Sequence, residues 1–155
     1  MSSTSTETLT TGTSTISIDA TAADVWAVLS DLGRIGDISP ECFKAEWEPG
    51  VTEPARGAPF RGYNRMGDFE WDTACMVVAA APELEWSIAV TAPEGPATIW
   101  RYLLSPTDKG CEVTETFDSP ALLTEYFQRM SPPRDGQLRE NISQTLTNLK
   151  VVVEG

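Results

Sequence analysis

Apolar side chains near the end of the chain recur with the spacing of an α-helix. Leu138, Ile142, Leu146, Leu149 and Val153 follow one another at intervals of four, four, three and four residues. Because an α-helix has about 3.6 residues per turn, this spacing places all five on one stripe. The pattern predicts a long amphipathic helix over roughly residues 135–153, and its stripe needs an apolar surface to cover it.

Alternating apolar and polar residues predict that this surface is a β-sheet. In one segment Phe43, Ala45 and Trp47 alternate with charged residues, a pattern typical of a strand with one buried face. Short turns join most of the strands, which favours an antiparallel meander. Seven strands are expected, at residues 13–19, 43–48, 60–65, 69–79, 84–90, 98–104 and 111–117.

Shorter helical segments are also predicted. Thr21 precedes an apolar run of helical period and Asp24 follows three residues later, which indicates a shortened capping box. Residues 33–42 contain two glycines and a proline, so we expect a short helical turn or loop there. Another short helix is expected at residues 121–130, ended by two prolines before the last helix.

The predicted fold class is therefore α+β. We expect a curved, antiparallel, seven-stranded sheet wrapped around the long C-terminal helix, with two short helices after the first strand and a cavity between sheet and helix. Residues 1–12, rich in Ser and Thr, are interpreted as a disordered tail, and residues 13–155 as a single domain.

The same alternation predicts which side chains line the cavity. Three tryptophans and a tyrosine lie on the strand faces expected to look toward the helix, and they would suit a flat or polycyclic apolar ligand. The alternative is that these aromatic side chains simply fill the core. The predicted ligand-binding positions are Phe60, Asn64, Trp71, Thr73, Cys75, Trp86, Ile88, Trp100, Tyr102, Glu115 and Phe117 on the strands, with Leu138 and Ile142 on the helix.

Glu115 is the most informative of these positions, because it lies between Val113 and Phe117 on a face predicted to be buried. Burying an isolated charge is costly, so its carboxyl group is expected to be protonated or paired. Glu115 and Tyr102 are the candidate catalytic residues, since a perturbed pKa suits proton transfer. Alternatively, a bulge turns Glu115 to solvent, or an arginine pairs with it structurally. The Asn64 amide and the Tyr102 hydroxyl could orient a ligand or satisfy nearby backbone groups.

Composition narrows the range of partners and chemistry. The chain has 155 residues, a net charge of −12 and no histidine. The acidic balance disfavours nucleic acids and anionic membranes, which attract clustered Lys and Arg. Without histidine there is no His-based catalysis and no His metal ligand. Cys42, Cys75 and Cys111 show no paired short spacing, so we expect free thiols in a reducing cytoplasm, no metal and no cofactor.

No apolar run approaches the roughly 20 residues of a membrane-spanning helix. The first residues lack the basic start and apolar centre of a signal peptide. We therefore expect no membrane insertion, and a protein that acts as a monomer or homodimer.

Three stretches of the chain resemble a known superfamily. Residues 16–31 (Ile-Ser-Ile-Asp-Ala-Thr-Ala-Ala-Asp-Val-Trp-Ala-Val-Leu-Ser-Asp) are similar to the opening strand and helix of the START/Bet v 1-like proteins. Residues 38–42 and 57–75 resemble the actinobacterial branch of the polyketide cyclase/dehydrase and lipid-transport (SRPBCC) family. The resemblance covers roughly residues 13–153 and implies a helix-grip fold with a deep apolar pocket between sheet and long helix.

Three functions are compatible with this resemblance. The leading hypothesis is binding of a hydrophobic small molecule, lipid-like or polyketide-like, for transport or sequestration. The first alternative is an aromatase/cyclase-type enzyme in which Glu115 or Tyr102 moves a proton, which requires a polar group of perturbed pKa facing an open pocket. The second is a regulatory protein-binding module, such as a toxin–antitoxin member, which requires a filled core and an apolar surface patch.

Overall fold

The computed structural model describes residues 9–91, 97–120 and 134–155. Within these ranges the chain forms seven strands, two short α-helices and a 3-10 turn after the first strand, and one long C-terminal helix. In chain order these are β1 (Leu9–Ile18), α1 (Ala22–Leu29), the turn η2 (Leu32–Arg34), α2 (Ile35–Ile38), β2 (Cys42–Trp47), β3 (Pro59–Met66), β4 (Phe69–Ala81), β5 (Glu85–Thr91), β6 (Ala97–Pro106), β7 (Cys111–Pro120) and α4 (Arg134–Glu154).

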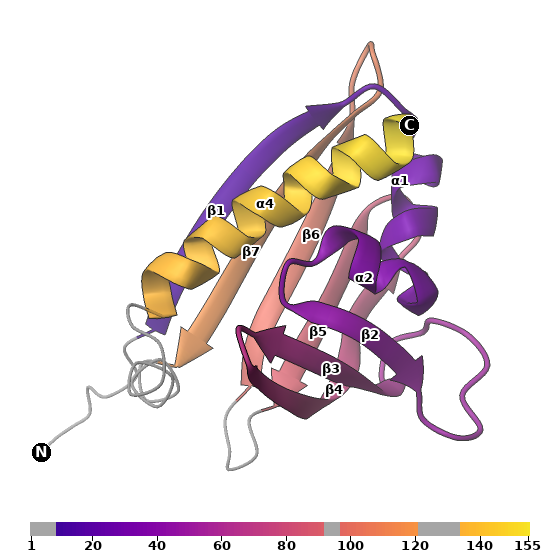
Figure 1. Ribbon diagram of the computed structural model, residues 1–155. Coiled ribbons are helices and arrows are strands. Elements are labelled where there is room, and N and C mark those ends of the chain that lie inside the picture. Colours follow the sequence, from indigo (N-terminus) through magenta and orange to yellow (C-terminus); the bar gives the residue numbers. More distant parts are fainter. Residues whose placement is uncertain (1–8, 92–96, 121–133) are drawn as a thin grey trace, which may run out of the picture.

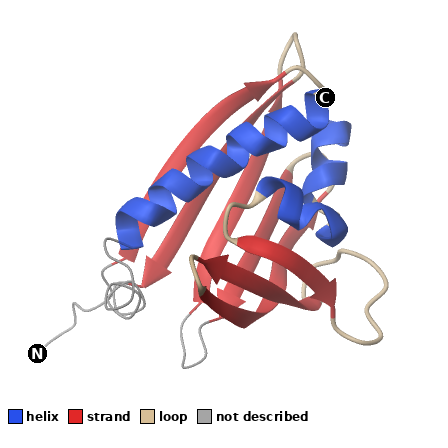
Figure 2. Cartoon of the chain, in the orientation of Figure 1, coloured by secondary structure: helices blue, strands red, loops and turns tan. Residues whose placement is uncertain are grey.

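All seven strands belong to one antiparallel sheet, in the order β1-β7-β6-β5-β4-β3-β2. The first and second strands of the chain therefore form its two edges. Figure 1 shows the sheet curving around α4, which packs on β1, while α1 and α2 lie beside α4. Figure 2 shows the helices gathered on one face of the sheet. The predicted α+β architecture, a curved seven-stranded sheet around a long C-terminal helix, is confirmed.

The first helix begins at the predicted cap. Thr21 Oγ1 accepts a hydrogen bond from the backbone N–H of Asp24 at 3.1 Å, which satisfies one of the free donors at the helix start. Val25 and Leu29, one turn apart, are buried. The Trp26 indole N–H donates to the carbonyl oxygen of Glu85 at 3.2 Å. This bond fastens α1 to the start of β5.

The C-terminal helix buries the predicted apolar stripe. Its four members from Leu138 to Leu149 are each at most 3% exposed, and Val153 is half-buried. Burial of each such side chain is worth roughly 1.5–3 kcal/mol. On the wetter side of the helix, Lys150 Nζ donates to the carbonyl oxygen of Ser17 at 3.0 Å, which ties α4 to the edge strand β1.

Three local features differ from the sequence-based expectation. β1 begins at Leu9 and pairs with β7 along its whole length, so its first residues belong to the sheet and not to the predicted tail. A register shift just after Cys42 turns Phe43 outward, where it is 40% exposed and packs against the Arg65 guanidinium. Leu84 lies in the turn before β5 and is exposed. The helix predicted at residues 121–130 lies outside the described residues.

Candidate functional site

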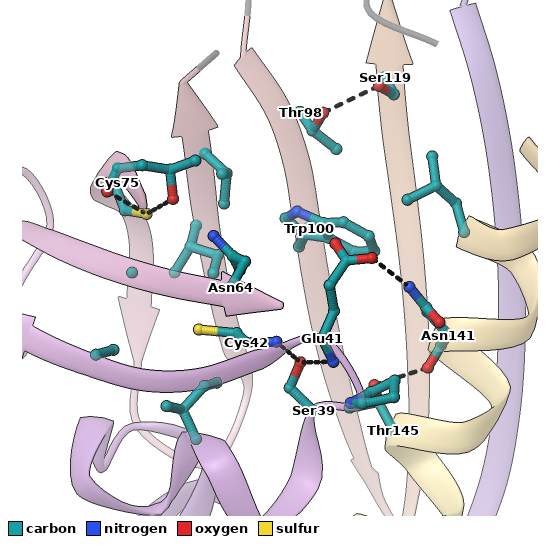
Figure 3. Close-up of a pocket in the computed structure, with 18 of the residues that line it drawn as sticks. Ser39, Glu41, Cys42, Asn64, Cys75, Thr98, Trp100, Ser119, Asn141 and Thr145 are labelled. Atoms are coloured by element: carbon teal, nitrogen blue, oxygen red, sulfur yellow. Dashed lines mark hydrogen bonds between the residues drawn. The ribbon is translucent and has the colours of Figure 1, made fainter. Parts of the chain in front are cut away.

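A cavity of about 140 Å³ lies between the sheet and α4. Its wall is built by strands β2 to β7, the loop between α2 and β2, and one side of α4. Figure 3 shows side chains from these elements converging on the same space. The sheet and the helix therefore do not fill the interior between them.

Most of the predicted ligand-binding positions meet at this cavity. Those that line it share the inward face of their strands or the first buried turn of α4. They are Phe60, Asn64, Trp71, Thr73, Cys75, Ile88, Trp100, Tyr102, Glu115 and Leu138. Trp86, Phe117 and Ile142 do not line the cavity; all three are packed in the core.

Long-range packing explains these three exceptions. Trp86 is 2% exposed and makes an edge-to-face contact with Trp26, their ring centroids 6.1 Å apart, so α1 covers it. Phe117 and Ile142 belong to a second core cluster, and the Phe117 ring packs against Trp100 at 5.5 Å. Alternation predicts the inward face of a strand, but it does not tell which part of that face another element covers.

A buried carboxyl and a buried hydroxyl lie side by side in the cavity wall. Tyr102 on β6 is directly paired with Glu115 on β7, and both side chains line the cavity. Glu115 is 1% exposed and Tyr102 is 7% exposed. The Tyr102 hydroxyl interacts with the Glu115 carboxyl, whereas Glu115 Oε1 has no hydrogen-bond partner. Among the buried side-chain nitrogen and oxygen atoms of the described residues, Glu115 Oε1 is the one left unpaired.

Burial sets the protonation of this pair. It raises the pKa of Glu115 well above the usual range, and the hydrogen bond with Tyr102 offsets only part of that shift. Burial and the adjacent Glu115 carboxyl together raise the pKa of the Tyr102 hydroxyl. No Lys or Arg is found among the described residues that line the cavity. With no positive charge beside it, the Glu115 carboxyl favours its neutral, protonated form.

A second polar pair lies on the same two strands. The hydroxyl groups of Thr98 on β6 and Ser119 on β7 are 2.9 Å apart, and both residues are buried in the cavity wall (Figure 3). Trp100 lies between this pair and Tyr102 along β6. Neither Thr98 nor Ser119 was among the predicted ligand-binding positions. Continuing the alternation of β6 and β7 by one step would have included both.

The loop between α2 and β2 closes one side of the cavity. Ser39 Oγ accepts hydrogen bonds from the backbone N–H groups of Glu41 and Cys42, at 3.2 and 2.9 Å. Asn141 on α4 donates from Nδ2 to Glu41 Oε2 at 3.3 Å, which connects the loop to the helix across the cavity (Figure 3). Thr145, also in the wall, donates to the Asn141 carbonyl oxygen at 2.7 Å. Asn141 and Thr145 are not among the predicted positions because the prediction considered only the apolar stripe of α4.

Two thiols face the cavity on either side of β3. Because Gly62 has no side chain, the sulfur atoms of Cys42 and Cys75 both lie 3.6 Å from the position that its Cβ would occupy. Burial raises the pKa of Cys42 to about 11 and also raises the pKa of Cys75. Both cysteines are free, as is Cys111. The two thiols at the cavity are therefore protonated, weakly polar parts of its wall.

Two further polar side chains of the wall, those of Asn64 and Thr73, have partners within the protein. Asn64 Nδ2 donates to the Trp71 carbonyl oxygen at 3.4 Å, and Thr73 Oγ1 lies 3.4 Å from Cys75 Sγ. In the described part of the chain, no three His, Cys, Asp or Glu side chains converge as metal ligands would. None of the helices in those ranges has the length and apolar character needed to cross a bilayer.

Comparison with known families identifies the family of this chain. The model of the family described as "Polyketide cyclase / dehydrase and lipid transport" matches residues 10–154. The chain belongs to this family. The polyketide cyclase/dehydrase and lipid-transport match spans every described element from β1 to α4, and the cavity lies within it.

Solved structures of other proteins share the fold. A polyketide-cyclase-like protein from Corynebacterium glutamicum is 26% identical, with a TM-score of 0.56, covering 95% of this chain and 86% of its own. A protein from Chromobacterium violaceum is 15% identical, with a TM-score of 0.71, covering 94% of this chain and 98% of its own. The two-domain aromatase/cyclase StfQ of the steffimycin biosynthetic pathway is 13% identical, with a TM-score of 0.70.

StfQ differs from this chain in length. The match covers 96% of this chain but only 51% of StfQ, so the chain spans about half of that two-domain protein. At this identity the likeness shows the helix-grip fold alone. The comparison with curated proteins produced no match.

Proposed function

We propose that this protein binds a hydrophobic small molecule, lipid-like or polyketide-like, in the cavity between the sheet and α4, for transport or sequestration. The observation that supports this most directly is the cavity itself. Protein interiors are normally close-packed and an unfilled space lowers stability, so a space retained here is consistent with a binding site. Its wall combines Trp71, Trp100 and aliphatic side chains with a few polar groups, the composition expected of a small-molecule site.

The family and the fold neighbours are consistent with this proposal. The family description includes lipid transport, and one fold neighbour, StfQ, is an aromatase/cyclase. The three free thiols fit a protein that acts in a reducing cytoplasm. The net charge of −12 argues against nucleic acid as a partner.

Native mass spectrometry of the purified protein tests the proposal. We expect the folded protein to carry an additional small-molecule mass that is lost on denaturation. A matched pair of variants then locates the site. Val90 lines the cavity from β5, whereas its neighbour Ala89 points to the opposite face of the same strand. Val90→Trp should fill the cavity and abolish the added mass, and Ala89→Trp should keep it.

An enzyme of the aromatase/cyclase type is the second candidate function. It is favoured by one observation: Glu115 and Tyr102 form a buried pair with raised pKa values in the wall of an open cavity. In this case Glu115 would donate or accept a proton on a bound polyketide chain. Tyr102→Phe and Glu115→Gln would then keep ligand binding but lose turnover. The regulatory alternative is disfavoured, because it required a filled core.

A further inference from the structure

The chemical character of the ligand can be inferred from the residues that the cavity presents to it. This inference rests on the proposed binding function. The described wall contains two carboxyl groups, Glu41 and Glu115, two protonated thiols and no Lys or Arg. A ligand carboxylate or phosphate would therefore be buried without an opposite charge, which is strongly unfavourable.

The unpaired atom of Glu115 identifies the docking point. A protonated carboxyl group has one O–H donor besides its acceptor oxygen. Glu115 Oε1 has no hydrogen-bond partner in the protein. An unsatisfied buried polar group costs about 1–3 kcal/mol, so a ligand that satisfies it gains affinity. The matching group on an uncharged ligand is an acceptor oxygen, such as a ketone, quinone or ester carbonyl.

The order of residues along β6 and β7 sets the shape of the ligand. Tyr102 with Glu115 forms one polar pair and Thr98 with Ser119 forms another, four residues away on each strand. At about 3.4 Å per residue the two pairs are roughly 14 Å apart. The indole of Trp100 lies between them, supported from behind by Phe117. The two hydroxyls of the second pair share one hydrogen bond, so one O–H donor and several lone pairs remain for a ligand.

We propose that the cavity selects an uncharged, elongated, flat molecule with an acceptor oxygen at the Glu115 end and a second polar group at the Thr98–Ser119 end. The described part of the wall offers no opposite charge to fatty acids and other anionic lipids, so they should bind more weakly.

Four probes of one shape test this selectivity by isothermal titration calorimetry. They are flavone, which carries a carbonyl, 4′-hydroxyflavone, which adds a hydroxyl at the far end, 2-phenylnaphthalene, which has no oxygen, and flavone-6-carboxylate, which is an anion. We expect 4′-hydroxyflavone to bind best and flavone to bind roughly three- to tenfold more tightly than 2-phenylnaphthalene, the effect of one net hydrogen bond. The carboxylate should bind most weakly.

Variants of Glu115 assign the preference to its carboxyl group. Glu115→Met removes the donor while keeping the length of the side chain, so flavone and 2-phenylnaphthalene should bind equally. Glu115→Gln restores an N–H donor and should restore the preference for flavone. Glu112→Gln is the same substitution on the exposed side of β7 and should change nothing. Circular dichroism establishes that each variant is folded before its binding is compared.

The pH dependence provides an independent readout. As the pH rises toward the pKa of Glu115, its donor is lost and the preference for flavone should fall in the wild type but not in Glu115→Gln. The other titratable groups of the described wall are Glu41 in the α2–β2 loop, Cys42 on β2, Cys75 on β4 and Tyr102 on β6, and α4 contributes none there.

The outcomes separate this inference from the proposed function. If 2-phenylnaphthalene binds as tightly as flavone to the wild type, or the carboxylate binds best, the inferred selectivity is wrong although the cavity still binds ligands. If no probe binds to the wild type and native mass spectrometry also finds no ligand, the binding function itself is wrong.

Discussion

Trp26 on α1 and Trp86 on β5 pack edge to face, with ring centroids 6.1 Å apart and an angle of 88° between the ring planes. The Trp26 indole N–H also donates to the carbonyl oxygen of Glu85, the residue next to Trp86. One side chain therefore holds the first helix on the sheet by both an aromatic contact and a hydrogen bond. It also removes Trp86 from the cavity wall.

This contact should account for a large part of the stability of α1. Trp26→Phe keeps a ring but loses the hydrogen bond, and should lower the free energy of unfolding by about 1 kcal/mol. Trp26→Ala removes the whole aromatic group and should cost about 3–5 kcal/mol. Urea denaturation followed by circular dichroism measures both. Equal losses in the two variants would contradict the separate role of the hydrogen bond.

Glu115 should make the protein less stable as the pH rises. Its pKa is raised in the folded state, so the native protein binds this proton more tightly than the unfolded chain does. The bound proton of Glu115 contributes fully to the free energy of unfolding below the unfolded pKa of 4.5. This contribution is lost as the pH rises through the folded pKa, at up to about 1.4 kcal/mol per pH unit. Glu115→Gln should therefore be more stable than the wild type at pH 8 and lose this advantage toward pH 4.5.

Thermal unfolding at a series of pH values provides the measurement. Glu112→Gln is again the matched control, because Glu112 is exposed on the same strand. A parallel stability profile for wild type and Glu115→Gln between pH 4.5 and pH 8 would show that Glu115 is ionised in the native protein.

The packing of α2 on β2 should not tolerate a side chain at Gly36. A Cβ added there would lie 2.6 Å from the carbonyl oxygen of Phe43, a backbone atom that cannot move independently. Gly36→Ala should destabilise the protein by about 1–3 kcal/mol, the usual cost of overpacking. At Gly33 the nearest atom is Oδ1 of the Asp31 side chain at 3.2 Å, so Gly33→Ala should change stability by less than about 0.5 kcal/mol. Equal effects of the two substitutions in urea denaturation would argue against this close approach.

The hydrogen bond between Asn141 and Glu41 should slow the exchange of a bound ligand. Asn141→Asp places a second carboxylate opposite Glu41, and their repulsion should loosen the α2–β2 loop from α4. Stopped-flow displacement of flavone should then show faster dissociation than in the wild type. Ser143→Asp adds the same charge on the exposed side of α4 and should leave the rate unchanged.

Cys42 should react slowly with alkylating reagents. With a pKa of about 11, roughly one thiol in a thousand is ionised at pH 8, against about a quarter of ordinary cysteines. Iodoacetamide should therefore modify Cys42 at least 100-fold more slowly in the folded protein than in urea, as followed by peptide mass spectrometry. Because Cys42 lines the cavity, saturating flavone should slow the reaction further. Rapid labelling of the folded protein would contradict the buried environment of this thiol.

Alternation along the strands placed most of the predicted ligand-binding positions at the cavity, although these positions make up fewer than half of its lining residues. The strict order Val113, Glu115, Phe117 placed the carboxyl on the buried face, and the structure finds it there because β7 is regular and flanked on both sides. The same rule failed at Phe43, where a register shift reverses the face. Nothing in the local sequence predicts this register shift.

The spacing of apolar residues does not predict contacts between elements that are far apart in the sequence. The contact of Trp86 with α1 depends on how a helix from the start of the chain packs against a strand in its middle. The link between Glu41 and Asn141 joins residues 100 positions apart. Polar residues at the margin of an apolar stripe, such as Asn141 and Thr145, give no signal until the helix is placed against the loop that they meet.

The order of the strands affects how a ligand would enter and leave the cavity. β1 and β2 lie at opposite edges of the sheet. Between them, α2 and the loop that follows it contact α4, through the hydrogen bonds from Asn148 to the Ile38 carbonyl and from Asn141 to Glu41. A passage on this side can open by breaking a few hydrogen bonds, each worth about 1 kcal/mol, while all hydrogen bonds between the strands stay intact. The β-sheet can thus remain rigid during loading and unloading, with the movement confined to the seam where loop meets helix.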